Sequence, residues 1–156
     1  MVQSGLADDA SVSQYRLAVH LGTALFIFSI LIWTGLDLLY RPSKRPNSHA
    51  IGSLMLIAIT ILAGAIVAGM DAGLMYNEYP FMGDHLVPSE YGETGLWDAF
   101  ENPVSAQFNH RWIAAITFVT VISLGISGYR RGQKYLGCMV IGCLLYTSPS
   151  PRDRSI

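Results

Sequence analysis

Charged side chains are scarce in this sequence, and that scarcity argues against a water-soluble globule. Of its 156 residues, 13% are Asp, Glu, Lys or Arg, whereas 51% are apolar. An ordinary soluble domain carries roughly 25% charged residues. The net charge of -1 provides no basic surface for nucleic acid, so we expect no nucleic-acid partner.

Cysteine is nearly absent as well. The two cysteines, Cys138 and Cys143, lie in an apolar stretch with no His or Cys partner at the spacing of zinc ligands. The sequence therefore indicates neither a zinc knuckle nor a disulfide scaffold.

Long apolar runs make up much of the remaining sequence. Leu17 to Leu39 contains one His and one Asp, and Ile51 to Met70 contains no ionisable group. Both exceed the roughly 18 residues of a transmembrane helix. A third run covers Trp112 to Gly128, and a fourth, Tyr135 to Tyr146, is too short to span. We predict an all-α polytopic membrane bundle with three complete transmembrane helices and a truncated fourth, the complete ones near residues 15 to 39, 50 to 73 and 107 to 129.

Lys and Arg are missing from the long segment between the second and third spans, residues 71 to 106, which contains several Asp and Glu. The basic residues lie instead in the two other links, namely Arg41, Lys44, Arg45, Arg130, Arg131 and Lys134. The positive-inside rule then places those links in the cytoplasm and the loop near 75 to 105 outside. Membrane lipid is the expected surrounding partner.

Two of the four histidines are candidates for function. His20 and His110 lie near the outer ends of the first and third spans, whereas His49 and His85 lie in polar links and are expected to be solvated. An ionisable group inside a span is costly and marks a functional candidate. Imidazole is a strong axial ligand of heme iron, so these two are the predicted metal ligands. The alternative is that each is hydrated or caps a neighbouring helix.

Two arginines accompany these histidines. Arg16 precedes His20 by one helical turn and shares its face, and Arg111 follows His110 directly. Each guanidinium could pair with a heme propionate, or extend to lipid phosphate instead. In the outer loop, Asp71, Asn77 and Glu78 could orient a substrate or relay protons, and solvated roles are equally compatible with the sequence.

Three segments together resemble the heme A synthase family. They are VSQYRLAVHLGTALFIFSILIWTGLDLL (12 to 39), AGAIVAGMDAGLMYNEYPFM (63 to 82) and FENPVSAQFNHRWIA (100 to 114). Their order and spacing are also similar, and the likeness covers about residues 2 to 129. The resemblance implies eight transmembrane helices in two four-helix halves. Residues 1 to 45 would end the amino-terminal half, and residues 46 to 142, with the outer loop 74 to 106, would begin the carboxy-terminal half.

The same resemblance implies oxidation of the C8 methyl of heme O to the formyl group of heme A. His20 would ligate a heme in the first half and His110 one in the second, so the two would bind different irons. Heme O would be the substrate and heme b the cofactor, and the catalytic glutamate would lie outside this chain. A heme O synthase and an electron donor are the implied partners, in a bacterial inner membrane with the loop on the periplasmic side.

Two other functions remain open from the residues alone. A di-heme cytochrome b-type electron carrier also uses paired histidines, but it commonly places them on opposite sides of the membrane. A transporter is a third reading, although the spans lack Gly and Pro interruptions at the midplane.

The last segment, CLLYTSPSPRDRSI (143 to 156), resembles a translated sequencing adapter and not the apolar helix that it interrupts. We expect it to contribute nothing to the natural protein, and we exclude it from the expected fold. Resequencing of the source DNA should replace this tail with further apolar helix. The same tail in an adapter-free long read would contradict the expectation.

Overall fold

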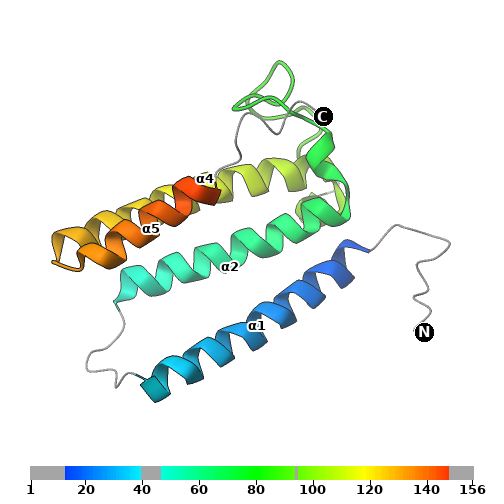
Figure 1. Cartoon of the computed structure of the whole chain (residues 1–156). Helices are drawn as coiled ribbons and strands as arrows, with labels where there is room; N and C mark the ends of the chain where they lie inside the picture. The colour runs from blue at the N-terminus through cyan, green and yellow to red at the C-terminus, as the bar shows by residue number, and fades with distance from the viewer. Residues whose placement is uncertain (1–12, 40–46, 94, 148–156) are drawn as a thin grey trace, which may run out of the picture. The chain divides into compact units, whose positions relative to one another are not determined.

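The computed structural model describes residues 13–39, 47–93 and 95–147, and these residues are mostly helical. The long helices are α1 (Gln14–Leu39), α2 (Ser48–Gly69), α4 (Pro103–Arg130) and α5 (Lys134–Thr147) (Figure 1). Three single-turn elements lie between α2 and α4, namely η1 (Ala72–Leu74), η2 (Gly95–Trp97) and α3 (Asp98–Glu101). The expected all-α fold is confirmed.

Three of the helices are long and apolar enough to cross a membrane. Helices α1, α2 and α4 have 26, 22 and 28 residues, and the most apolar 18-residue stretch of each has a mean hydropathy of 2.0, 2.5 and 1.7. A helix satisfies its backbone polar groups internally, which lipid cannot do for it. The chain is therefore a multi-pass membrane protein. Helix α5, with 14 described residues, reaches only about 21 Å at a rise of ~1.5 Å per residue, which is shorter than a bilayer core of about 30 Å.

Two helix boundaries differ from the predicted ones. Helix α2 ends at Gly69 and not near 73, because Asp71 adopts a left-handed conformation with φ 53° and the chain then forms η1. Helix α4 begins at Pro103 and not near 107. Proline is favoured at a first helical position, where its missing N–H leaves no bond unmade. In both cases local backbone chemistry, and not hydropathy, determines the boundary.

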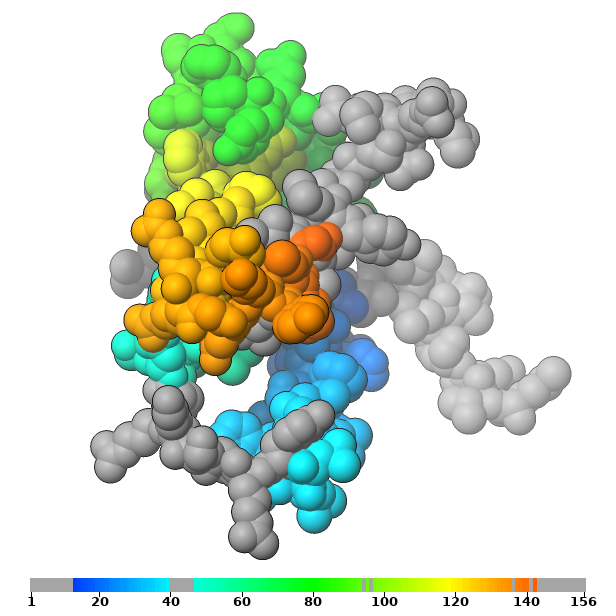
Figure 2. Space-filling view, turned by 60° about the vertical axis from the view of Figure 1, so that its left-hand side comes forward, coloured from blue at the N-terminus to red at the C-terminus, as the bar shows by residue number. Residues whose placement is uncertain are grey.

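The chain forms two compact units, the first made of residues 13–39 and 58–113 within the described ranges. Here α1 approaches the second part of α2 closely. A Cβ atom on Gly69 would lie 2.5 Å from Cα of Gln14, and one on Gly22 would lie 3.4 Å from a methyl of Leu62. The residues between α2 and α4 form a packed mass, coloured green in Figure 2.

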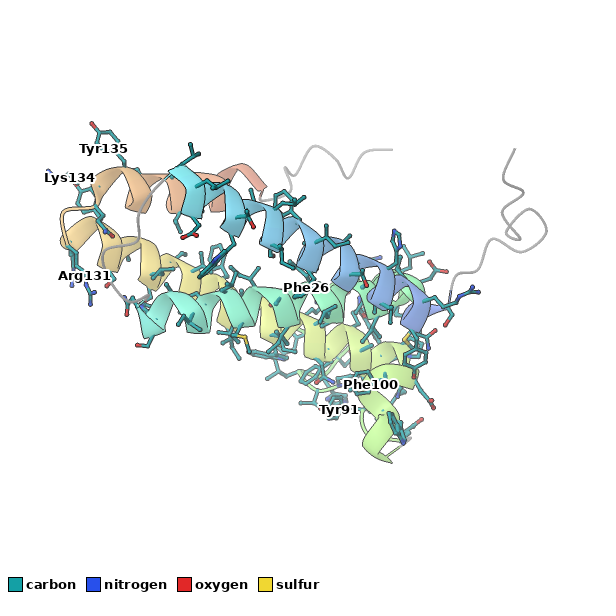
Figure 3. All side chains as sticks on the ribbon, turned by 90° about the horizontal axis from the view of Figure 1, so that it is seen from below. Phe26, Tyr91, Phe100, Arg131, Lys134 and Tyr135 are labelled. Carbon is teal, nitrogen blue, oxygen red and sulfur yellow. The ribbon has the colours of Figure 1, made fainter. Side chains whose placement is uncertain are left out.

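The second unit contains residues 47–57 and 114–147 of the described chain. A Cβ on Gly137 of α5 would lie 2.7 Å from the carbonyl oxygen of Gly125, so glycine permits the close contact of α5 with α4. The turn between them is closed by Gly132 at φ 84°, whose left-handed conformation ends α4. Figure 3 shows Arg131, Lys134 and Tyr135 gathered at this turn.

The orientation of the chain across the membrane is testable by labelling. Cysteines introduced singly at Ser43 and Ser89, in a background lacking Cys138 and Cys143, should react from opposite sides of an intact membrane. The reason is that Lys and Arg are retained on the cytoplasmic side. Ser89 is exposed in the structure, and Ser43 lies outside the described residues. Labelling of both positions from the same side would contradict the orientation.

Residues 143 to 147 of the predicted adapter tail lie within a described helix. Helix α5 extends to Thr147, and residues 148 to 156 lie outside the described residues. The assignment of 143 to 156 to an adapter, and the boundary at residues 45 and 46 between two evolutionary halves, both stay predictions.

Candidate functional site

The first turns of α4 are tied to the loop that precedes them. The Oδ1 atom of Asn102 accepts a hydrogen bond from the backbone N–H of Val104 at 3.0 Å and so caps the helix. Its Nδ2 atom donates to the Glu90 carbonyl at 2.8 Å and to Oδ1 of Asp98 at 3.1 Å. One amide side chain therefore begins the helix and fixes two parts of the loop to it.

Aromatic side chains strengthen this attachment. Tyr91 packs edge-on against Phe108 with ring centroids 4.9 Å apart, and its hydroxyl donates to Oδ1 of Asn109 at 3.2 Å. Phe108 in turn lies 6.2 Å from the ring of Trp112. Figure 3 shows Tyr91 beside the first part of α4. Aromatic pairs of this kind contribute more stability than the burial of their apolar area alone. These contacts pack this part of the outer loop against α4.

Gln107 and Arg111, one helical turn apart on α4, converge on the same carbonyl oxygen. The Gln107 Nε2 atom donates to the Tyr76 carbonyl at 2.8 Å, and the Arg111 guanidinium donates to the same oxygen. Arg111 also donates to the Glu78 carbonyl at 2.6 Å. We call this arrangement of Gln107, Arg111 and the Tyr76 carbonyl the carbonyl clamp. It holds the segment that follows η1 against α4, on either side of His110.

His110 lies inside the first unit, with its imidazole against α2. The ring has a hydrogen-bond partner in the backbone of Thr60. One helical turn later, a Cβ on Gly64 would lie 3.0 Å from Cε1 of the ring, so the ring occupies the space that a side chain would fill. The Nδ1 atom of His110 is buried and has no hydrogen-bond partner. This nitrogen has the chemistry of a metal ligand.

His20 has a different environment, although it belongs to the same unit. Its side chain is exposed on α1. With Arg16 it lines an open hollow of about 480 Å³, whose other lining residues are Tyr15, Val19 and Thr23. Three of the predicted site residues thus fall into two groups. His20 lies with Arg16 on α1, and His110 packs against α2.

The buried polar atoms without partners gather at this end of α4. Among the residues that the structure describes, they are Ser105 Oγ, Gln107 Oε1 and His110 Nδ1. Ser105 is fully buried and Gln107 is 4% exposed. Buried polar atoms normally have a partner, so each such atom needs an explanation. Three within six residues single out this end of the helix as a candidate site.

The remaining predicted residues lie on the surface. Asp71, Asn77 and Glu78 are exposed, and the backbone of Glu78 serves the carbonyl clamp. Arg111 is engaged by backbone carbonyls, and its five N–H donors exceed these bonds, so its predicted role toward a propionate stays a prediction. Sequence reasoning missed Gln107 and Gly64. The spacing could have indicated Gln107, because it precedes His110 by three residues and Arg111 by four. On a helix this spacing places all three side chains near one face.

The carbonyl clamp yields a measurable prediction. Replacing Gln107→Leu or Arg111→Met singly leaves the Tyr76 carbonyl one donor, whereas the double variant removes both. Loss of the last partner of a buried carbonyl costs about 1–3 kcal/mol. Hydrogen exchange of the backbone amides of residues 73 to 78 should therefore become faster in the double variant. The increase should exceed the sum of the increases in the two single variants.

The matched control is Gln133→Leu, which removes an amide that is exposed in the turn after α4. It should leave exchange in residues 73 to 78 unchanged. Unchanged exchange in the double variant would show that other contacts hold this segment.

Comparison with known proteins identifies the family. The cytochrome oxidase assembly protein family COX15-CtaA matches residues 1–147. The chain is 46% identical over 140 residues to the heme A synthase of Granulibacter bethesdensis, covering 85% of this chain and 37% of that protein. It is 43% identical over 140 residues to the heme A synthase of Rhodospirillum centenum, with the same two coverages.

A human relative is similar to the same degree. Heme A synthase COX15 of Homo sapiens is 43% identical over 140 residues, covering 80% of this chain and 34% of that protein. The chain therefore spans about a third of the length of the curated relatives it matches. No solved structure matches it. From the family match and these identities, the chain belongs to the COX15-CtaA family of cytochrome oxidase assembly proteins.

Proposed function

We propose that this chain is a segment of a heme A synthase, a membrane oxidoreductase that converts the C8 methyl group of heme O to the formyl group of heme A. The observation that carries the proposal is the packed imidazole of His110, with a buried nitrogen that has no partner, in a chain that is 46% and 43% identical to two heme A synthases over 140 aligned residues.

The residues present fit a heme. His110 would ligate a heme b through its imidazole, and His20 would ligate a second heme, the substrate heme O, in the other half of the full-length protein. Arg16 lines the same hollow as His20, where its guanidinium suits a propionate carboxylate. Arg111 would serve the His110 heme with the donors that the carbonyl clamp does not use.

The reaction replaces two hydrogens of a methyl group by a doubly bonded oxygen, so that carbon loses four electrons. With dioxygen as the oxidant, CH3 + 2 O2 + 4 e− + 4 H+ would give CHO + 3 H2O, and the redox partner would supply the electrons. Heme iron supplies one-electron chemistry, with a potential that depends on its axial ligands and their surroundings. The residues of this chain would hold and orient the hemes. The two imidazoles would fix the macrocycles, and the carbonyl clamp would keep the outer loop closed over the end of α4. Such closure would limit the access of water to the reacting group.

The setting follows from the same proposal. The full-length protein would lie in a bacterial inner membrane, surrounded by membrane lipid, with the loop 74 to 106 on the periplasmic side. It would receive heme O from a heme O synthase and exchange electrons with a redox partner. The acidic loop and the basic links support this orientation.

Activity can be tested in a strain that lacks its own enzyme and is supplied with heme O and reductant. The full-length gene should yield heme A in extracted pigments. Residues 1 to 142 alone should yield none, because they would present each heme with one imidazole and an incomplete helix bundle. Bound heme without conversion by the full-length gene would favour the di-heme cytochrome instead.

The assignment of the two histidines to separate hemes has its own test. In the full-length protein, His20→Met and His110→Met should each perturb a different heme in optical and electron-spin-resonance spectra. His49→Met is the control and should perturb neither. His49 lies in the first turn of α2 and not in the polar link expected from the sequence, and the proposal assigns it no heme. Loss of the same heme in both variants would mean a shared iron.

A further inference from the structure

Gly64 is the glycine of α2 whose backbone faces the His110 ring. A Cβ atom there would lie 3.0 Å from Cε1 and 3.6 Å from both Nδ1 and Nε2. Carbon atoms in contact prefer separations of about 3.5–4.0 Å. A methyl group at this position would therefore force the ring, or the helix, to move.

The ring is also held one helical turn earlier. Its hydrogen bond goes to the backbone of Thr60, four residues before Gly64 on α2. Residues four apart on a helix lie on the same face, one above the other. A single turn of α2 thus supplies both a hydrogen-bond partner and a close-packed surface for one imidazole, so the ring has a defined orientation before any ligand is considered.

The contacted atom makes this packing relevant to ligation. Cε1 lies between the two ring nitrogens and is bonded to both. Whichever nitrogen binds a metal, a group that presses on Cε1 displaces the ligating atom or rotates the ring plane. Axial-ligand orientation and the groups that fix it tune a bound metal.

Other glycines of α2 lack this relation to the ring. A Cβ on Gly52 would meet nothing within 4 Å, and one on Gly69 would meet Gln14 of α1. Alanine is a better helix former than glycine, so an unobstructed Gly→Ala change in α2 should be tolerated. Gly64 thus differs from the other glycines of α2 because it contacts the His110 ring.

We infer that Gly64 is a positioning residue, which sets the orientation of the His110 imidazole on a heme iron through direct packing against Cε1. The inference rests on the proposed function, because it requires His110 to be an axial ligand. It goes further by assigning a residue on α2 to the tuning of that heme.

The test compares Gly64→Ala with Gly52→Ala in the full-length holoprotein. His110→Met first identifies the heme that His110 ligates. In Gly64→Ala, the largest g value and the midpoint potential of that heme should shift while the other heme keeps its signals. The reason is that the spin-resonance spectrum of a low-spin ferric heme depends on the orientation of its imidazole planes. Gly52→Ala should leave both hemes unchanged.

A second pair of variants covers the case in which Gly64→Ala does not accumulate. His110→Gly removes the ring, so the added methyl of Gly64→Ala then meets empty space. The double variant should accumulate as well as His110→Gly alone, which is the non-additivity expected of two groups in contact. A double variant as poor as Gly64→Ala would overturn the inference.

The outcomes separate this inference from the function on which it rests. If His110→Met removes one heme signal while Gly64→Ala leaves that signal at its wild-type position, Gly64 has no positioning role and the proposed function stands. If His110→Met changes no heme signal, both the ligand assignment and the inference fail.

Discussion

Two donors from α4, the amide of Gln107 and the guanidinium of Arg111, meet at the carbonyl oxygen of Tyr76, and the arrangement of the first unit depends on this meeting. The chain leaves α2 at Gly69, where carbonyl groups lose their helical partners. Near lipid, such groups need donors from elsewhere in the protein. Further along the same segment, the carbonyl clamp gives the Tyr76 and Glu78 carbonyls donors from α4, and it thereby fixes the loop relative to the helix that carries His110.

The helices themselves could be predicted from the sequence, because hydropathy and length decide whether a segment spans. The helix ends were harder, since they depend on single residues. Asp71 ends the helical region through a left-handed backbone conformation, and Asn102 with Pro103 begins the next helix earlier than its apolar run. An Asn-Pro pair is a readable helix-start signal, but hydropathy outweighed it in the prediction of a start near 107.

The candidate site was predictable only in part. Histidines inside apolar segments stand out, so His20 and His110 could be singled out as candidates. Gly64 lies in a row of small residues, AGAIVAG, that any close-packed membrane helix could contain. Gln107 carries no charge and has no motif of its own. Their roles arise from which atoms they approach across the bundle, and one-dimensional patterns do not contain that information.

Hydroxyl groups in the spanning helices show why the start of α4 is unusual. Thr23, Ser29 and Thr34 each donate to the carbonyl four residues earlier, at 2.7 or 2.8 Å, which satisfies a polar group inside an apolar segment. Ser105 is buried without such a bond. Together with Gln107 Oε1 and His110 Nδ1, it places three polar atoms in an environment where each unpaired group is costly.

The two histidines differ in a way that matches the two demands of the proposed reaction. A resident electron-carrying heme benefits from a ligand whose orientation does not vary, because reorganisation around the iron then stays small. His110, held by the backbone of Thr60 and packed against Gly64, has that character. A heme that enters as substrate and leaves as product needs an accessible ligand. In the proposed function, His20 beside Arg16 on α1 would be that ligand, so one chain would carry a fixed ligand and an exchangeable one.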